Sequence, residues 1–373
     1  MLASLAIVGI LISGLIGRDQ MLKKDNEPLR VSSIQTSANK KDYHTKSEHK
    51  RYRILVLDGG GIKGLMQLEL LRYLELKNQK PIAEQFDGFI CSSVGCALSG
   101  MLLTTHHHQY PTIDEIARMM TTKSVLKQIF NQSRFRMLAT MNGFFGPKYS
   151  GRSKAHFLRE YFDQLRYNQL AKPLMMISWS PELVEPVLLT NWTQHGYEHW
   201  PVWMIIQGVT SPPVFFPPTH IIDHNLKGYT YELDLNDGGL FLNNPILPTI
   251  IEIMVNEFSG QKPVLIVNIG TGIAKDPYTY NKIKNWGGYH WLSPLMNSMG
   301  TLAGIMAVDQ IKSFVKDRKK YERLYLFNTE MTASEIKLDN ITQRNVNNLE
   351  QRGRDLVLDN LEALDQLAKE LLE

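Results

Sequence analysis

Apolar and polar positions alternate along the chain in a way that predicts strands and helices in turn. The apolar run at 53–58 predicts a buried strand, and the broad apolar face of 65–76 predicts a helix. A second apolar run at 86–92 predicts another strand, and the segment 94–103, rich in small residues, predicts another helix. This strand-helix-strand-helix order is typical of a parallel sheet that is covered by helices.

The rest of the chain continues the pattern as far as the C-terminal part. Segment 104–165 is predicted to be mainly helical, and segment 202–218 is predicted to begin as a helix and to break at its prolines. The recurring leucines of 346–372 predict a C-terminal helix. Further strands are predicted at 172–180, 185–191, 230–239, 263–269 and 321–328. With no repeat and no internal boundary, we expect one α/β domain over 51–373, with a mostly parallel central sheet flanked by helices.

The first 50 residues differ in character from this domain. Residues 2–17 are apolar and uncharged, which is slightly short of the roughly 20 residues that a membrane span needs. As a signal peptide the run lacks a basic beginning and a clear cleavage site. We expect 1–17 to be an N-terminal anchor, with a cleaved signal and secretion as the alternative. Because basic residues follow the run, the body is expected on the cytoplasmic side of a membrane.

Residues 18–50 are polar and predict a linker. The basic cluster at 40–53 is either a solvated part of that linker or a patch that touches anionic headgroups. The net charge of +4 is modest and argues against a nucleic-acid partner. Cys91 and Cys96, five positions apart, resemble neither a disulfide framework nor a metal site.

The glycine-rich loop after the first strand matches the dinucleotide pattern G-x-G-x-x-G through Gly59, Gly61 and Gly64. A dinucleotide site also needs an acidic residue at the end of the second strand, about 20 residues further on. Glu84 has the right distance but comes before that strand, so a nucleotide site is not favoured. The loop amides, chiefly those of Gly60 and Gly61, are instead suited to a transient negative charge on a substrate oxygen.

Two further motifs supply reactive groups. Ser93-x-Gly95 lies where the strand 86–92 turns into a helix, which is the position of a nucleophile elbow, although a serine there also serves as a plain helix cap. Asp237 ends a strand and is followed by Gly238 and Gly239. This sequence is either an ordinary turn or a carboxylate that accepts a serine proton.

Together, DGGGIKG at 58–64, SSVG at 92–95 and DGGLFLNNP at 237–245 resemble the patatin-like phospholipase family. The segments 147–162, 209–218 and 267–272 are similar to that family in style. The resemblance implies a patatin-like three-layer α/β/α fold and a lipid acyl hydrolase with a serine–aspartate dyad, without a catalytic histidine, metal or cofactor. It also implies a lipid substrate at a membrane surface.

The resemblance assigns roles residue by residue. Ser93 becomes the nucleophile and Asp237 the proton acceptor. The oxyanion loop is formed by Gly59, Gly60, Gly61 and Gly64, and the supporting motif residues are Asp58, Lys63, Gly95, Gly238 and Gly239.

The chain departs from the family pattern at three positions. Cys91 stands where the family usually has glycine, and Cys96 where it has glycine or another small residue. Lys63 replaces the common arginine and loses its bidentate fork. The predicted function is hydrolysis of fatty-acyl esters in membrane phospholipids or related lipids. The alternatives are a non-catalytic lipid-binding or scaffold protein, with Cys91 marking lost chemistry, and an acyltransferase.

The histidines offer one alternative mechanism. His290 is the only histidine after Asp237, as a serine-aspartate-histidine triad requires, but its aromatic surroundings favour packing or lipid contact. His106 to His108, His195 and His199 are expected in loops or at the surface. The apolar run 286–308 either lines an acyl channel or forms a buried helix.

Overall fold

The computed structural model describes most of the chain after residue 49. The described residues are 50–192, 196–226, 229–255, 263–274, 279–288, 290–291, 294, 302, 304–309, 323–332, 335 and 337–373. The predicted anchor at 1–17 and nearly all of the predicted linker lie outside this set. Of the helices within it, none combines the length and apolar character that a bilayer crossing requires.

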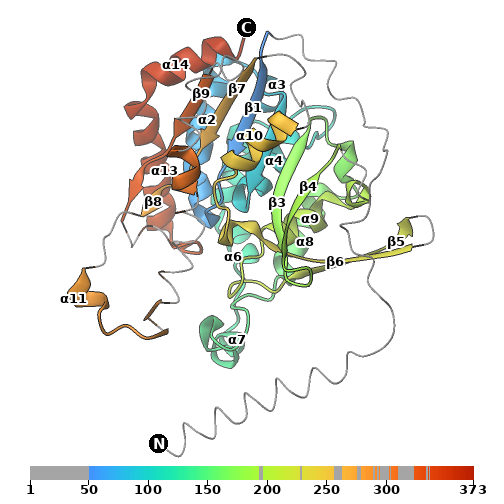
Figure 1. The fold of residues 1–373 in the computed structure, drawn as a ribbon, viewed down its shortest axis with the longest axis vertical. Coiled ribbons are helices and arrows are strands. Elements are labelled where there is room, and N and C mark those ends of the chain that lie inside the picture. The colour runs from blue at the N-terminus through green and yellow to red at the C-terminus, as the bar shows by residue number, and fades with distance from the viewer. Residues whose placement is uncertain are drawn as a thin grey trace, which may run out of the picture. The chain divides into compact units, whose positions relative to one another are not determined.

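A mixed β-sheet forms the centre of the described body (Figure 1). Its strands follow the order β5-β6-β3-β2-β1-β7-β9, and β4 also pairs with β3. The strands are β1 (Tyr52–Leu57), β2 (Gly88–Ser92), β3 (Leu174–Ser180), β4 (Glu185–Thr190), β5 (Thr219–Leu226), β6 (Tyr229–Asp237), β7 (Val264–Ile269) and β9 (Arg323–Phe327). A separate small pair joins β8 (Ile273–Ala274) to β10 (Glu330–Met331).

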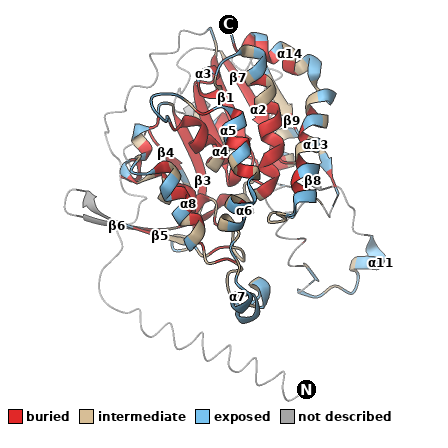
Figure 2. Ribbon diagram, turned by 180° about the vertical axis from the view of Figure 1, so that it is seen from behind, coloured by how far each residue is buried: buried red, intermediate tan, exposed pale blue. Residues whose placement is uncertain are grey.

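Helices cover both faces of the sheet, because alternate side chains of each buried strand point to opposite sides. In β1, Leu55 and Leu57 belong to the larger core cluster, and Ile54 and Val56 belong to the smaller one. Figure 1 shows α10 in front of the strands, and Figure 2 shows α2, α4 and α5 over the opposite face. The three-layer α/β/α fold predicted from the sequence is therefore confirmed.

The α-helices vary in length from single turns to more than four turns. They are α2 (Gly64–Asn78), α3 (Ile82–Gln85), α4 (Val94–Leu103), α5 (Ile113–Thr121), α6 (Lys123–Ile129), α7 (Arg134–Ala139), α8 (Arg152–Phe162), α9 (Val202–Val209), α10 (Ile246–Val255), α11 (Tyr280–Ile283), α13 (Gln343–Asp359) and α14 (Leu361–Glu370). Short 3-10 turns are η2 (Gly61–Lys63), η3 (Met141–Gly143), η4 (Tyr167–Gln169), η5 (Tyr197–His199) and η6 (Gly238–Leu240).

The sheet is parallel in its centre and antiparallel on one side. β1, β2, β3, β7 and β9 run parallel to their neighbours in this group, whereas β4 and β6 run antiparallel to β3, and β5 runs antiparallel to β6. The reversal begins after Ser180, where a short turn leads directly into β4, and a short turn can only join antiparallel strands. The expected mostly parallel sheet is thus mixed on the β3 side.

The predicted elements agree closely with the structure near the sheet centre and less well elsewhere. The helix predicted at 94–103 is α4, with the same bounds, and α9 ends at Val209, before the prolines. The helical prediction for 346–372 is confirmed, although the segment belongs to two helices, α13 and α14, that are separated at Asn360. Strand β5 was not predicted.

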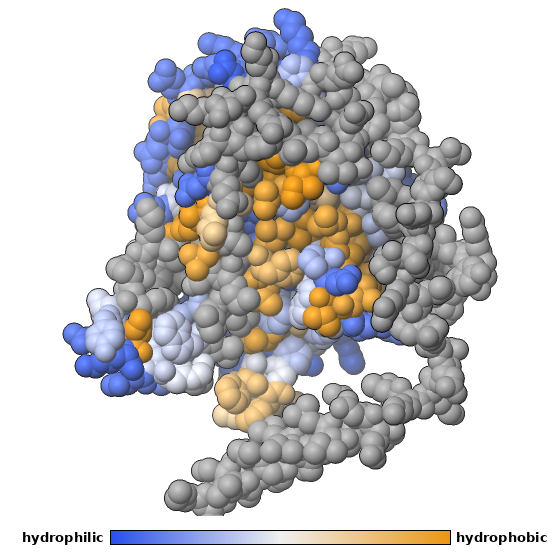
Figure 3. Space-filling view, in the orientation of Figure 1, coloured by the Kyte–Doolittle hydropathy of each residue, from blue (hydrophilic) through white to orange (hydrophobic). Residues whose placement is uncertain are grey.

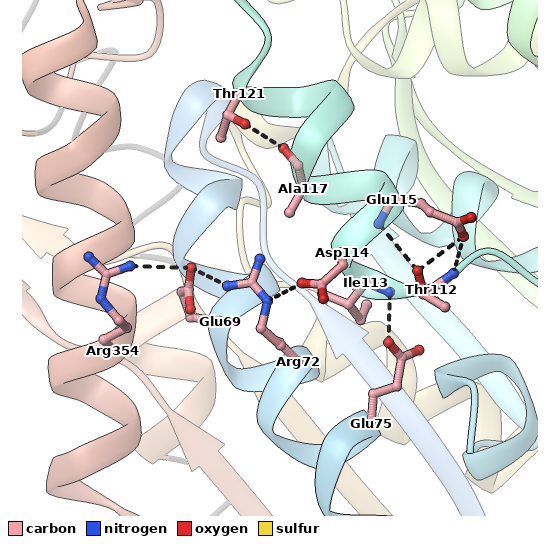
Figure 4. Close-up of polar contacts among 10 residues, drawn as sticks. All are labelled: Glu69, Arg72, Glu75, Thr112, Ile113, Asp114, Glu115, Ala117, Thr121 and Arg354. Carbon is pink, nitrogen blue, oxygen red and sulfur yellow. Dashed lines mark hydrogen bonds and ion pairs between the residues drawn. The ribbon is translucent and has the colours of Figure 1, made fainter. Parts of the chain in front are cut away.

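Ion pairs fasten three helices that lie far apart in the sequence (Figure 4). Glu69 of α2 contacts Arg72 on the same helix and Arg354 of α13, and Arg72 also pairs with Asp114 of α5. Glu75 accepts a hydrogen bond from the N–H of Ile113. These contacts set α5 and α13 against α2, the helix that begins at the glycine-rich loop.

Candidate active site

Ser93 occupies a sharp turn between β2 and α4. Its backbone has φ 49° and ψ −123°, a conformation that few residues other than glycine adopt. A Cβ placed on Gly95 would lie 2.4 Å from the carbonyl oxygen of Leu57, so strand and helix can approach this closely only with glycine there. Strain of this kind is often stored at functional sites, and it matches the geometry expected of a nucleophile elbow.

The Ser93 hydroxyl donates a hydrogen bond of 2.5 Å to Oδ2 of Asp237. The two residues are 144 positions apart in sequence, and both are buried. Asp237 ends β6, and its other carboxylate oxygen accepts the N–H of Gly239 at 2.8 Å. Its own N–H donates to the carbonyl of Ser211 at 3.2 Å. The turn after β6 therefore fixes the carboxylate in the orientation that meets the serine.

Burial dominates the electrostatics of Asp237. Loss of water raises its pKa to about 6, against the lowering effects of the Ser93 and Gly239 hydrogen bonds and the charge of Lys154. A carboxylate with a pKa in this range is a stronger proton acceptor than an exposed aspartate, yet it is still largely ionised at neutral pH.

The glycine-rich loop lies beside Ser93, because a Cβ on Gly59 would come within 2.9 Å of the Ser93 Cβ. The N–H of Gly59 donates to the carbonyl of Asn243, and the N–H of Gly64 donates inside its own turn. Within the described residues, the N–H groups of Gly60 and Gly61 have no protein acceptor. Of the four glycines predicted for the oxyanion loop, these two have N–H groups available to a substrate oxygen.

Asp58 organises the base of this loop. Its carboxylate accepts hydrogen bonds from the side chains of Asn268 at 2.7 Å and Asn244 at 3.1 Å. Burial raises the pKa of Asp58 to about 7, and the asparagine hydrogen bonds and the charge of Lys63 act in the opposite direction. Asp58 thus connects the loop to β7 through Asn268 and to the segment after Asp237 through Asn244.

Lys63 lies between Gly61 and Gly64 of the loop and is almost fully buried. Burial lowers its pKa to about 8, while the nearby negative charge of Asp58 opposes that change. The positive charge expected at this motif position is therefore retained next to Asp58.

A largely apolar cavity of about 790 Å³, including its open mouth, adjoins Ser93. Its walls come from α4, α5, α6, α8 and α9, and from the loop that holds Phe215 and Phe216. Gly61 and Ile62 border it next to the serine. None of its lining residues comes from the run 286–308, much of which lies outside the described residues, so the acyl-channel interpretation of that run stays a prediction.

Lys154 is the one cationic residue among those that line this cavity. Its ammonium donates to the carbonyls of Gln207 and Thr210 and to the hydroxyls of Thr210 and Ser211, at 2.7 to 3.2 Å. It lies 4.0 Å from the ring centre of Phe216. Burial lowers its pKa to about 7, and the charge of Asp237 opposes this shift. Lys154 therefore binds the C-terminal end of α9 and also interacts with the charge of Asp237.

Three contributions to the site, those of Lys154, Asn244 and Asn268, were not predicted. Two of these residues had a detectable signal. Asn268 is polar within the otherwise apolar strand 264–269, and Lys154 falls three and four positions before Phe157 and Leu158, on the buried face of α8. A charged or amide side chain at a core position needs partners, and here the partners are site residues.

Cys91 and Cys96 flank Ser93, and burial first and then nearby charges, that of Asp237 among them, raise the pKa of the Cys96 thiol. Cys91 and Cys96 are buried free thiols, and Cys91 donates to the carbonyl of Met175 at 3.4 Å. His290 is exposed and its ring stacks on Trp286.

The remaining histidines were expected in loops or at the surface. His106 pairs with Gln109 in an isolated bridge, and His199 contacts Asn168 at the surface. His195 lies outside the described residues.

Comparison with known proteins gives consistent matches. A family model described as patatin-like phospholipase matches residues 55–250. Patatin group J-1 and patatin-B1, both of Solanum tuberosum, are each 24% identical to this chain over 331 residues, spanning 82% of it and 83% of their own length.

Two solved structures are similar at low identity. VipD from Legionella pneumophila covers 89% of this chain and 72% of its own, with a TM-score of 0.43 and 14% identity. The ExoU-SpcU complex from Pseudomonas aeruginosa gives a TM-score of 0.25 at 12% identity, covering 92% of this chain and 68% of that one.

Proposed function

Since the chain belongs to the patatin-like phospholipase family, and so to the lipid acyl hydrolases, we propose that it cleaves fatty-acyl ester bonds of membrane phospholipids or related lipids. In this proposal Ser93 is the nucleophile and Asp237 is its proton acceptor. The observation that carries the proposal is the buried hydrogen bond of 2.5 Å between the Ser93 hydroxyl and the Asp237 carboxylate. This pair lies beside an apolar cavity and beside two unengaged loop amides.

The mechanism follows from these contacts. As Ser93 Oγ attacks the ester carbonyl carbon, its proton passes to Asp237 Oδ2. The negative charge that develops on the carbonyl oxygen is stabilised by the N–H groups of Gly60 and Gly61. The protonated Asp237 then gives the proton to the leaving alcohol. In the second half, Asp237 takes a proton from the water molecule that attacks the acyl carbon, and it returns this proton to Ser93 Oγ as the fatty acid leaves.

The cavity suits the acyl part of such a substrate, because its walls are almost entirely apolar and it opens next to Ser93. The proposal also includes the location inferred from the sequence pattern, in which segment 1–17 anchors the body at the cytoplasmic side of a membrane. A lipid substrate would then be held close to the enzyme.

Two variants test the dyad in the full-length chain. We expect Ser93→Ala to lower the rate of fatty-acid release from phospholipid micelles at least about a thousandfold, and Asp237→Asn to lower it strongly as well. His290→Ala should leave the rate unchanged. Full activity in Ser93→Ala would contradict the proposal, and selective loss in His290→Ala would favour a triad.

Covalent labelling separates the alternatives. A fluorophosphonate should add once to the wild-type chain, at Ser93, and not to Ser93→Ala. An unlabelled and inactive wild-type chain that still binds vesicles would support the scaffold alternative. If acyl transfer to an added alcohol exceeds transfer to water, the acyltransferase alternative is supported.

A further inference from the structure

An exposed apolar segment projects from the body between α6 and α8. It comprises residues 134–145, which form α7 and η3, and α7 buries none of its described side chains. Figures 1 and 2 show α7 outside the layers of the fold, and Figure 2 colours it as exposed. The exposed fractions of its large apolar side chains are 82% for Phe135, 43% for Met137, 74% for Leu138, 61% for Met141, 58% for Phe144 and 61% for Phe145.

The segment 134–145, termed the tip, has a defined structure. The Ser133 hydroxyl caps α7 by accepting the N–H of Arg136, and the Arg136 guanidinium donates to the carbonyl of Pro147 at 3.0 Å. The N–H of Phe145 returns to the carbonyl of Thr140 at 3.0 Å. The apolar side chains therefore point outward from a closed turn. In Figure 3 an apolar patch lies at the place that α7 has in Figure 1.

Both ends of the tip continue into the walls of the cavity beside Ser93. On one side, Leu126 and Ile129 of α6 and Phe130 directly after it line that cavity. On the other side, Lys148 and Tyr149 donate their N–H groups to the carbonyls of Val214 and Phe215, at 2.8 Å each. Phe215 is itself a cavity residue, so the exposed tip and the cavity share the same supporting segments.

The surroundings of the tip are basic, which the modest net charge of the whole chain conceals. Residues 116–159 contain no aspartate or glutamate. They contain nine basic residues, which are Arg118, Lys123, Lys127, Arg134, Arg136, Lys148, Arg152, Lys154 and Arg159. Lys148 pairs with Asp339 and Lys154 is buried, but Lys123 and Lys127 of α6 and Arg134 of α7 are exposed.

We propose that residues 134–145 insert into the interface of a bilayer that contains anionic phospholipids and so place the cavity mouth against the lipid. Exposed apolar groups ringed by cations are the combination that binds such interfaces, through apolar burial and attraction to anionic headgroups. A second copy of the chain is a poorer occupant, because a symmetric contact would bring two basic surfaces together. The delivery of lipid to Ser93 rests on the proposed function, whereas the insertion itself does not.

Insertion can be measured without any catalysis. A fluorophore sensitive to polarity is attached to Phe144→Cys in a full-length chain that also carries Ser93→Ala. The native thiols of Cys91 and Cys96 are fully buried, so the label is directed to the new cysteine. Leu76→Cys is the matched control, since Leu76 is 59% exposed near the far end of α2, the helix that begins at the glycine-rich loop.

Vesicles of phosphatidylcholine with phosphatidylserine should raise the emission of the label at position 144 several-fold and shift it to the blue, and leave the label at position 76 unchanged. Arg134→Glu with Lys127→Glu should weaken the response, and pure phosphatidylcholine should give a smaller one. No response at 144, or equal responses at both positions, overturns the proposal. A response to protein concentration without vesicles would assign the tip to contact between copies instead.

A second measurement links insertion to turnover. Replacing Phe135, Leu138, Phe144 and Phe145 by serine in the active chain should reduce hydrolysis of vesicle lipid at least several-fold and leave hydrolysis of a soluble short-chain ester unchanged. Leu76→Ser with Leu358→Ser is the control, because both side chains are exposed elsewhere. Equal loss on both substrates overturns the link. A wild-type chain with no activity on either substrate contradicts the proposed function and leaves the fluorescence test decisive.

Discussion

Burial of the Asp237 carboxylate creates the basicity that the proposed chemistry needs. An exposed aspartate is too weakly basic to accept a serine proton readily, and burial raises the pKa of Asp237 to about 6. The hydrogen bonds from Ser93 and Gly239 limit this rise, so the carboxylate remains ionised near neutral pH. The turn after β6 supplies the Gly239 donor and therefore both orients and tunes the residue.

The pH dependence of turnover follows from this value. The base form of Asp237 exists above its pKa, so kcat/KM for a soluble ester should be constant well above about pH 6 and should fall about tenfold per pH unit well below it. Initial rates across the acidic range test this expectation. A profile that stays flat through this range in a protein shown to remain folded would contradict Asp237 as the base.

Lys154 should shift that profile. Its charge lowers the pKa of Asp237, so Lys154→Met should move the acidic midpoint of kcat/KM to higher pH. Lys148→Met is the matched control, because Lys148 belongs to the same segment but pairs with Asp339. A midpoint that moves equally in both variants, or in neither, would remove Lys154 from the electrostatics of the dyad.

At the scale of elements, the site depends on how closely α4 crosses β1. Because a Cβ on Gly95 would lie 2.4 Å from the backbone oxygen of Leu57, Gly95→Ala must displace either the helix or the central strand. We expect a loss of about 2 kcal/mol in the free energy of unfolding, as is typical of overpacking. Urea denaturation measures it. Gly287→Ala is the control, since a Cβ there would meet nothing within 4 Å, and an equally small effect in both variants would contradict the argument.

The strands and helices also differ in how well they could be predicted from the sequence. Buried strands such as β1 and β7 are mostly apolar runs, each with one polar position, and their bounds follow from the flanking turn residues. The antiparallel pairing of β6 with β3 joins residues far apart in the sequence and leaves no local pattern, whereas β5 pairs with the strand that directly follows it. The break at Asn360 interrupts a recurrence of leucines that continues on both sides of it.

The candidate site likewise contains residues that the sequence identified and residues that it did not. Ser93, Asp237 and the glycine loop belong to contiguous motifs at strand ends, so short stretches of sequence identified them. Lys154 and Asn268 act through contacts that only the folded chain brings about, since the partners of Asn268 include Asp58, 210 positions away. Their roles therefore could not follow from spacing alone.

At the scale of the whole molecule, the fold extends well beyond the part that the family model matches. β7 pairs with β1 along six positions and lies between β1 and β9, and Asn268 on β7 holds Asp58. A fragment of residues 50–250 lacks β7, so we expect it to expose the edge of β1 and to show no cooperative unfolding transition in urea. The chain of residues 50–373 is the control, and a cooperative transition in the shorter fragment would contradict this expectation.

The 210 positions between Asp58 and Asn268 also set the order of events during synthesis. A growing chain on the ribosome carries Ser93 long before it carries Asp237. The glycine loop also lacks its contact with Asn268 until β7 has left the exit tunnel. Under the proposed mechanism, the nascent protein is therefore unable to attack lipid until most of it has been made. The connectivity of the chain would thus delay activity until the last part of the candidate site has been made.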